Sequence, residues 1–323
     1  MLRASCCPRR WQWPQASNAS PAKQVPVKCD CDNTVVGASF ASAETSLEQD
    51  RSVRSDDSHA SQPQFVPRPL TSEERKLAWT AANFTGASGD QVAPVALWML
   101  GPSSVGKSTI AVDAAPRFDI PCSSATDTDT DPRRRLDAVI VDGEFMRDAH
   151  GLWKQWIETD DWRSAYPALK SIINLEKDEL CHEAVRQRKH LVIPQTALKL
   201  PKALAEMEEL TRSGYINHVL AVVAPLSECQ QRGWRRELTT GKRYQAAEFQ
   251  QSISAIPPLI ANSNGRYAVV RARERMGTLY GMDFDVLQEG SGGVAVSGLG
   301  TAAPPMTKLE AVIGRAIGKS DLR

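Results

Sequence analysis

The chain has 323 residues, of which 39 are Lys or Arg and 38 are Asp or Glu, so its formal net charge is only +1. This balance provides neither the basic field that favours nucleic-acid binding nor a strongly acidic tail. No stretch approaches the roughly 20 apolar residues that a membrane span needs. The length is sufficient for one large domain or two small ones with a core of their own.

The seven cysteines show no repeated spacing, and four of them lie before residue 32. Cys29 and Cys31 cannot by themselves supply the four ligands of a structural zinc site. We therefore expect no disulfide framework and a compartment that keeps thiols reduced, with the cytoplasm as the first expectation. An organelle is the alternative, because the segment before Asp30 contains Arg and Ser but no acidic residue, as transit peptides do.

Three regions are expected along the chain. Residues 1–68 are rich in Ser, Ala, Pro and Gln without apolar periodicity, which predicts a disordered tail. Order should begin near Thr71, which forms a capping-box pattern with Glu74 ahead of an apolar helix. We expect a kinase-like domain over residues 69–275 and an irregular C-terminal extension over residues 276–323, with one weak helix at 309–317.

Short apolar runs alternate with helical periods through the predicted domain. The expected strands are Val95–Leu100, Leu136–Val141, Leu191–Ile193, His218–Val223 and Tyr267–Val270, and the expected helices are Pro167–Lys189, Pro201–Ser213 and Ser227–Glu237. Pro167 is expected in the first turn of its helix, where a missing N–H costs nothing. Alternation of strands and helices predicts βαβ units and therefore an α/β fold with a mainly parallel central sheet.

The segment after the first strand is a complete G-x-x-x-x-G-K-S phosphate-binding loop between a strand and a helix, which is the setting that this motif requires. Its backbone N–H groups form an anion cradle. Lys107 is expected to reach the β- and γ-phosphates, and the Ser108 hydroxyl to ligate Mg²⁺, so ATP and Mg²⁺ are the predicted cofactors. The predicted nucleotide-binding residues are Gly101, Pro102, Ser103, Ser104, Val105, Gly106, Lys107, Ser108 and Thr109.

Asp142 directly follows an apolar strand, so it should lie at the carboxyl edge of the sheet, where open α/β folds bind ligands. Three roles are open to it. It could accept the proton of a substrate hydroxyl, assist Mg²⁺, or cap the next helix. We favour the general base, because this strand comes soon after the phosphate loop, and Glu144 is the second candidate on the substrate side.

A basic segment follows the predicted helix at 227–237. Phosphoryl transfer needs cations over the γ-phosphate, and a helix with arginines that runs into a Gly-containing loop is typical of a lid over ATP. At most two or three of its five cations can face the nucleotide. They are Arg232, Arg235, Arg236, Lys242 and Arg243.

From Val95 to Tyr244 these motifs, in this order, resemble the zeta-toxin family of P-loop kinases, which phosphorylate the sugar of UDP-N-acetylglucosamine. The phosphate loop, the Asp-Gly-Glu stretch at Asp142, the Ser213-Gly214-Tyr215 turn and Arg235-x-Glu237 carry the resemblance. It implies a P-loop kinase fold in which Lys107 and Ser108 hold phosphates and metal. It also implies that Asp142 is the catalytic base and that Arg235 and Arg243 clamp ATP.

The chain departs from the family after its central strand. Where the family reads Glu-Gly-Thr-Gly-Arg, this sequence has Pro194-Gln195-Thr196-Ala197-Leu198. Thr196 alone is retained and stays a candidate for the acceptor side, whereas Leu198 replaces an arginine that would hold the acceptor. The resemblance therefore supports fold and reaction better than it supports the substrate.

The predicted function is transfer of the ATP γ-phosphate to a hydroxyl of a small molecule, with a UDP-amino sugar as one candidate acceptor. Two alternatives stay open. A polynucleotide or nucleoside kinase is disfavoured by the near-neutral charge, because gripping several phosphates requires a basic stripe. A nucleotide-binding regulator without transfer is favoured by the altered acceptor motif and opposed by the intact Lys107, Ser108 and Asp142.

Overall fold

The computed structural model describes residues 66–122, 136–157, 162–274, 282–293 and 305–318. Nearly all of the predicted tail, residues 1–65, lies outside these ranges, so its disorder stays a prediction. Among the described helices, none has both the length and the apolar character needed to cross a membrane.

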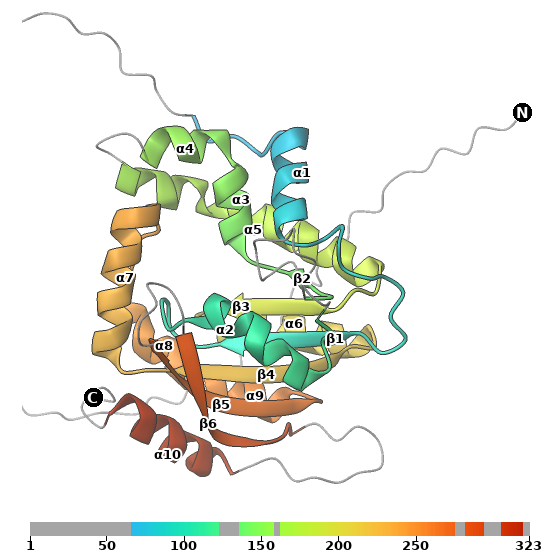
Figure 1. The fold of residues 1–323 in the computed structure, drawn as a ribbon, viewed down its shortest axis with the longest axis vertical. Coiled ribbons are helices and arrows are strands. Elements are labelled where there is room, and N and C mark those ends of the chain that lie inside the picture. Colours follow the sequence, from blue (N-terminus) through green and yellow to red (C-terminus); the bar gives the residue numbers. More distant parts are fainter. Residues whose placement is uncertain (1–65, 123–135, 158–161, 275–281, 294–304, 319–323) are drawn as a thin grey trace, which may run out of the picture. The chain divides into compact units, whose positions relative to one another are not determined.

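Six strands form one sheet in the order β2-β3-β1-β4-β5-β6 (Figure 1). All pairs from β2 to β5 are parallel, and only β6 runs antiparallel to its neighbour β5. This architecture confirms the predicted mainly parallel α/β fold. The strands are β1 Val95–Leu100, β2 Val139–Ile140, β3 Leu191–Gln195, β4 Ile216–Val223, β5 Arg266–Glu274 and β6 Met282–Ser291.

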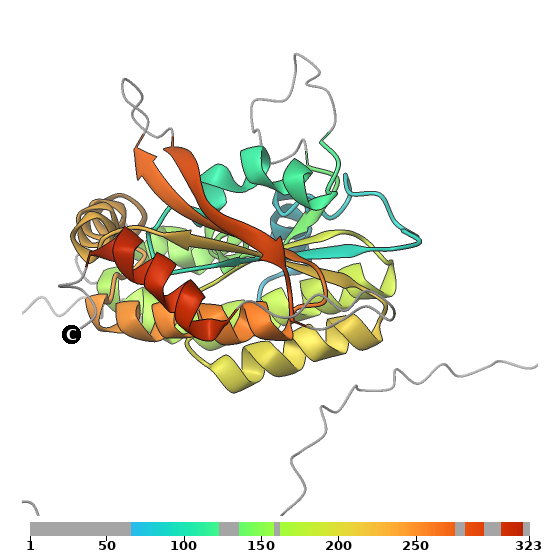
Figure 2. The same ribbon diagram turned by 90° about the horizontal axis from the view of Figure 1, so that it is seen from below.

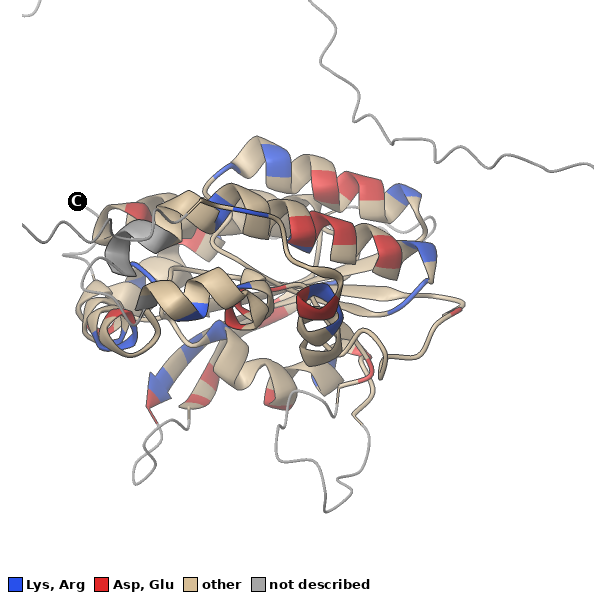
Figure 3. Ribbon diagram, turned by 90° about the horizontal axis from the view of Figure 1, so that it is seen from above, with Lys and Arg blue, Asp and Glu red and all other residues tan. Residues whose placement is uncertain are grey.

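Helices cover both faces of the sheet. Figure 2 shows α2 on one face and α6, α9 and α10 on the opposite face. Lys and Arg are mixed with Asp and Glu along the helices of the upper side, as the sequence of α6 illustrates (Figure 3). The α-helices are α1 Ser72–Ala81, α2 Lys107–Ala114, α3 Gly143–Ala149, α4 Gly151–Ile157, α5 Trp162–Arg186, α6 Leu200–Arg212, α7 Leu226–Thr240, α8 Phe249–Ser254, α9 Ile256–Asn262 and α10 Met306–Ile317.

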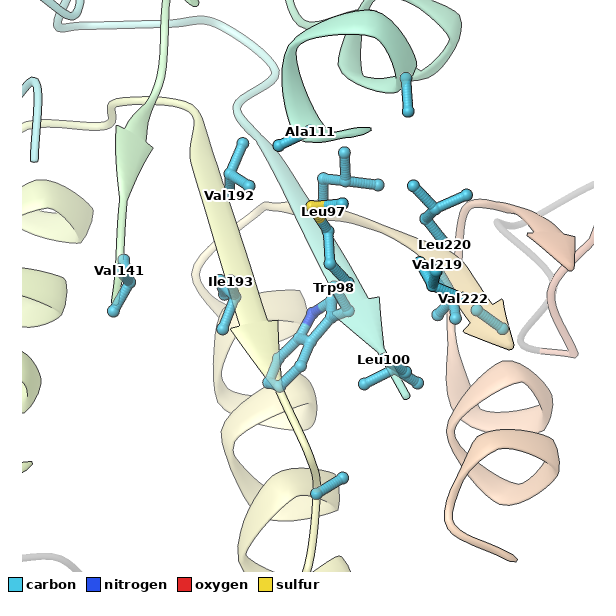
Figure 4. Close-up of a cluster of buried hydrophobic side chains, with 14 of the residues drawn as sticks. Leu97, Trp98, Leu100, Ala111, Val141, Val192, Ile193, Val219, Leu220 and Val222 are labelled. Atoms are coloured by element: carbon cyan, nitrogen blue, oxygen red, sulfur yellow. The ribbon is translucent and has the colours of Figure 1, made fainter. Parts of the chain in front are cut away.

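The central strand β1 is buried along its whole length, as expected for a parallel strand with helices on both faces. Its neighbours on the sheet contribute aliphatic side chains to the same core (Figure 4). Trp98 is the largest fully buried side chain of the described residues, and its indole Nε1 donates a hydrogen bond of 2.8 Å to Oδ1 of the fully buried Asn217. The amide of Asn217 in turn donates to Met207 O and to Thr211 Oγ1 on α6. This polar residue therefore joins the sheet to a covering helix, and its own side-chain amide is fully paired.

The first helix begins as the sequence predicts. Thr71 Oγ1 accepts a hydrogen bond from Glu74 N at 3.2 Å, and Glu74 Oε2 accepts one from Thr71 N at 2.8 Å, which completes the capping box. Arg68 pairs with the same carboxylate at 2.7 Å, and Gly151 N donates to it at 2.8 Å. Glu74, in the first turn of α1, thus ties the helix both to Arg68 before it and to the start of α4.

Two expectations about regular structure are wrong in detail. Helix α5 begins at Trp162, so Pro167 lies inside the helix rather than in its first turn. In the described part of the C-terminal segment, helix α10 agrees with the helix expected at 309–317, whereas strand β6 lies where irregular structure was expected. Strand β6 carries a weak sequence signal because it is an edge strand with much of its length exposed. Helix α10 packs through Leu309, Ile313 and Ile317, which are buried.

Candidate active site

The phosphate loop connects the carboxyl end of β1 to helix α2, and two glycines determine its path. Gly101 has φ +138°, and a Cβ there would lie 2.1 Å from the carbonyl oxygen of Val222. Gly106 has φ +103°, and a Cβ there would lie 2.3 Å from Sδ of Met282 on β6. Both positions combine a left-handed backbone with a neighbour in contact, so the loop requires glycine at each.

The Lys107 ammonium folds back over this loop. Its Nζ donates hydrogen bonds of 2.7 Å to the carbonyl oxygens of Gly101 and Pro102. Loss of solvent around the ammonium, together with the neighbouring cations Lys242 and Arg236, lowers the pKa of Lys107 to about 7. The side chain is therefore held at the loop in a setting that favours an arriving anion.

Asp142 lies at the end of β2 and uses its two carboxylate oxygens differently. Oδ1 accepts a hydrogen bond of 3.0 Å from Glu144 N and so caps helix α3, while Oδ2 lies 3.5 Å from Ser108 Oγ. Burial alone would raise the pKa of Asp142. The charges of Lys242 and Arg147 and the Glu144 N–H outweigh that effect and hold the pKa below its ordinary value. The carboxylate is thus ionised at neutral pH, and helix capping does not exclude the two chemical roles.

Three cations of the predicted lid segment approach the phosphate loop, and one of them, Arg232, donates from Nη1 to the carbonyl oxygen of Val105 at 3.1 Å. Arg236 on α7 donates from Nη2 to Ser103 Oγ at 2.9 Å. Lys242, just after α7, is half-buried, and loss of solvent with the charges of Arg236 and Arg147 lowers its pKa to about 8, against the opposing charge of Asp142. Both side chains therefore lie where they can meet phosphate oxygens held by the loop.

The two arginines that the family resemblance selects lie further out. Arg235 and Arg243 are exposed at the rim of the cleft, and Arg235 Nη1 lies 3.8 Å from Oε1 of Glu274. Sequence reasoning did not select Arg236, although a signal for it exists. Gly233, three residues earlier on α7, is buried and so marks the inward face of the helix.

All these groups open into one cleft of about 1170 Å³. Its described lining has eleven Lys and Arg residues against six Asp and Glu residues, in contrast with the near-neutral chain as a whole. The cations are Lys107, Arg147, Lys170, Lys177, Lys199, Lys202, Arg232, Arg235, Arg236, Lys242 and Arg243. The acidic residues are Asp113, Asp142, Glu144, Glu206, Glu248 and Glu274. The excess of positive charge indicates that the cleft is built for anionic ligands.

The predicted acceptor-side residues Glu144 and Thr196 also line this cleft. Between β3 and α6, Ala197 has φ +52°, a left-handed conformation at the position where the zeta-toxin motif has its second glycine. Gln195 donates from Nε2 to Glu206 Oε2 at 3.2 Å, which links this segment to α6. The loop thus keeps a glycine-type backbone although its side chains differ from the family motif.

The oxygen ligands available for a metal ion are few. Ser108 Oγ and Asp142 Oδ2 face each other at 3.5 Å, and no group of three or more His, Cys, Asp or Glu suited to a metal occurs in the described part of the chain. This donor set fits Mg²⁺, which takes hard oxygen ligands and commonly keeps waters and substrate phosphates in its shell. It does not fit a metal that needs a complete protein cage.

The fold is similar to that of a chain from the PezAT chromosomal toxin–antitoxin system of Streptococcus pneumoniae, with a TM-score of 0.53 and 14% sequence identity. The similarity covers 78% of this chain and 92% of that chain. The chain has a zeta-toxin-like fold.

Two further similarities are weaker. The AvrRxo1-ORF1:AvrRxo1-ORF2 complex with sulphate ions has a TM-score of 0.47 and 13% identity, covering 79% of this chain and 90% of that chain. The AvrRxo1-ORF1:-ORF2 structure with ATP has a TM-score of 0.46 and 13% identity, covering 76% and 82%. Neither similarity is high enough to support a conclusion. No protein-family model and no curated protein matches the sequence.

Proposed function

We propose that this protein is an ATP-dependent kinase that transfers the γ-phosphate to a hydroxyl group of a small molecule. One observation carries the proposal: the phosphate loop, the Asp142 carboxylate and two inward cations open into one cleft. Phosphoryl transfer requires little covalent chemistry from the protein and depends on positioning and on cations over the transferred group. A zeta-toxin-like fold supports the same reaction class.

The nucleotide side of the proposed site consists of the loop and its cations. The loop N–H groups and Lys107 would bind the β- and γ-phosphates. Arg236 and Lys242 would neutralise the charge that develops on the transferred group, because they lie closer to the loop than the rim residues Arg235 and Arg243. Mg²⁺ would be held by Ser108 with water and phosphate oxygens, and it would withdraw charge from the phosphates when bound.

On the acceptor side we assign Asp142 as the general base. Its carboxylate is ionised because its pKa is lowered, and one oxygen stays available after the other has capped α3. A base of this kind positions the acceptor hydroxyl and accepts its proton as the new P–O bond forms. Because Ser108 Oγ lies beside Asp142 Oδ2, a second role is open to Asp142, in which it helps to hold Mg²⁺. The effect of Asp142→Asn on binding and on transfer separates this role from that of the base.

The zeta-toxin resemblance and the positive charge of the cleft together select the first acceptor to test. A UDP-amino sugar is the first acceptor to test, since the zeta-toxin resemblance implies it and a net positive cleft suits it. A polynucleotide acceptor is disfavoured because the chain as a whole is near neutral and, outside the cleft, Lys and Arg are mixed with Asp and Glu along the helices (Figure 3).

The test is a transfer assay with γ-labelled ATP, Mg²⁺ and a panel of nucleotide sugars, sugar phosphates and nucleosides. We expect the label to move to one hydroxyl compound of the panel, and Lys107→Ala to abolish the transfer. ATP binding without turnover on any acceptor, and without slow hydrolysis, would instead indicate a nucleotide-binding regulator. The observation that favours this second function is the segment Pro194–Leu198, which differs from the acceptor motif of the zeta-toxin family.

A further inference from the structure

Arg147, on helix α3, is a buried cation in the wall of the cleft. The residue is only 7% exposed, and it lines the cleft. Its guanidinium carbon lies 5.8 Å from the centre of the Tyr166 ring, and a Cβ at Gly143 would lie 3.8 Å from its Nη1. The ring of Trp153 meets that of Tyr166 edge-on at 6.3 Å. Two aromatic side chains therefore hold the guanidinium beside the residue that follows Asp142.

No carboxylate matches the charge of Arg147. Among the described residues its guanidinium has the contact with Tyr166 but no hydrogen bond and no ion pair. Arg232, another largely buried arginine of the cleft, is by contrast bound to Glu228 at 2.7 Å. Burial of a cation without an anion is costly, because the protein replaces little of the lost solvation. Arg147 is therefore placed to gain from an anion that a ligand brings.

Two further cations surround the same space. Loss of solvent lowers the pKa of Arg236 and that of Lys242, and the charge of Arg147 lowers both further. The Arg236 Nε is also buried without a hydrogen-bond partner in the part of the chain that the structure describes. Arg236 and Lys242 come from α7 and the segment after it, whereas Arg147 comes from α3. An anion between these elements would be stabilised by three cations at once.

We propose that Arg147 is a further catalytic residue, which contacts the phosphoryl oxygens from the acceptor side while the group is transferred. The inference rests on the proposed kinase function and adds a cation from outside the lid segment. During transfer the bond from the γ-phosphorus to the ADP oxygen breaks, the acceptor oxygen forms the new P–O bond, and its proton passes to Asp142. Charge is then spread over the three remaining oxygens of the phosphoryl group. The planar fork of a guanidinium can donate to two such oxygens together.

The experiment compares a ground-state probe with a mimic of the group in transfer. The first probe is a non-hydrolysable ATP analogue, and the second is ADP with aluminium fluoride, each titrated with Mg²⁺ by calorimetry. We expect aluminium fluoride to tighten ADP binding to the wild-type protein at least about tenfold. R147Q should lose most of this gain and keep the affinity for the ATP analogue. Slow ATP hydrolysis at saturating ATP should fall by about 10²- to 10³-fold in R147Q.

Matched variants test the fork and its support. R147K keeps the charge but not the planar fork, so it should retain the fold and lose most of the aluminium fluoride gain. Y166F keeps the ring under the guanidinium and should hydrolyse ATP like the wild type. Y166L removes the ring and should slow hydrolysis about two- to fivefold, the factor that a cation–π contact contributes. R186Q changes an exposed arginine outside the cleft lining and should have no effect.

The same aluminium fluoride gain in R147Q, R147K and the wild type would overturn the role of Arg147. A wild-type protein whose ADP affinity aluminium fluoride leaves unchanged would overturn it as well. A lower melting temperature with a parallel loss of both probes, in R147Q and also in R147K, would show that Arg147 only supports the fold. Failure of the wild-type protein to bind the ATP analogue would instead overturn the kinase proposal.

Discussion

The hydroxyl of Ser108 and the carboxylate of Asp142 lie 3.5 Å apart although 34 residues separate them in the chain. Strand β3 makes this approach possible, because it pairs with β1 on one side and β2 on the other, both in parallel. The carboxyl ends of these strands therefore reach the same edge of the sheet. This contact places Ser108, on the nucleotide side of the cleft, beside Asp142, on the proposed acceptor side.

Replacing Asp142 with Asn should separate its two chemical roles. If Asp142 is the base, binding of Mg·ATP should stay near wild type, and transfer at saturating ATP should fall by roughly two to four orders of magnitude. If it instead assists Mg²⁺, nucleotide affinity should fall with the rate, and raised Mg²⁺ should partly restore both. Calorimetric titration and slow ATP hydrolysis measure the two quantities without a known acceptor. Asp90→Asn, in an exposed loop, is the matched control, and full activity of Asp142→Asn would rule out both roles and redirect attention to Glu144.

Arg236 and its neighbour Arg235 form a natural pair of test and control. Arg236→Ala should lower kcat by about 10²- to 10³-fold, because it removes the guanidinium that donates to Ser103 of the phosphate loop. Arg235→Ala should change kcat by no more than about threefold, since its partner is a surface carboxylate at 3.8 Å. Steady-state kinetics with a melting curve for each variant provides the comparison. A larger effect for Arg235 than for Arg236 would support the assignment that the family resemblance implies.

Above pH 7, the protein should take up protons when it binds a nucleotide. The pKa of Lys107 is lowered to about 7 and that of Lys242 to about 8 in the free protein, so both lose protons as the pH rises from 7 to 9. Bound phosphates favour the charged ammonium and raise both pKa values, so ATP affinity should fall roughly tenfold or more over this interval. Calorimetry at pH 8 in buffers of different ionisation enthalpy should show uptake of roughly one proton. Identical heats in all buffers would show that neither lysine changes protonation on binding.

The boundary of the folded region can be tested by two truncations. Removal of residues 1–65 should leave the melting temperature and ATP affinity unchanged, because that segment has too little apolar sequence to join a core. Removal of residues 1–70 should lower the melting temperature by a few degrees. The second truncation deletes Arg68, which pairs with Glu74 and whose carbonyl oxygen lies 3.0 Å from Nε2 of the buried His150. Equal loss of stability in both truncations would mean that residues 1–65 also pack on the domain.

Asn217 should matter for stability rather than for nucleotide binding. Asn217→Ala leaves the buried Trp98 indole N–H without its acceptor and removes the two bonds to α6. We expect the free energy of unfolding to fall by about 2–4 kcal/mol, since an orphaned buried polar group costs about 1–3 kcal/mol and a small cavity adds to it. Denaturant unfolding measures the change, and Asn262→Ala, at an exposed helix end, is the control. A loss below 1 kcal/mol for Asn217→Ala would show that solvent reaches the indole.

Features that depend on adjacent residues could be predicted from the sequence alone. The phosphate loop could be predicted because its glycines, lysine and serine act through the backbone of one short segment. The capping box at Thr71 and the buried strand Val95–Leu100 depend equally on adjacent residues, and the structure confirms both. The mainly parallel sheet followed from the alternation of apolar runs with helical periods.

Tertiary structure decided which side chains share the cleft. Arg235 and Arg236 are adjacent in sequence, and only the packing of α7 determines that one faces solvent while the other contacts Ser103. Strand β6 joins the sheet by pairing with β5, a partnership for which its own partly exposed pattern gives little signal. Lys170 and Lys199 lie on different elements, and no periodicity relates them. Both line the cleft because the tertiary fold brings α5 and the start of α6 together, a long-range effect that no local sequence pattern encodes.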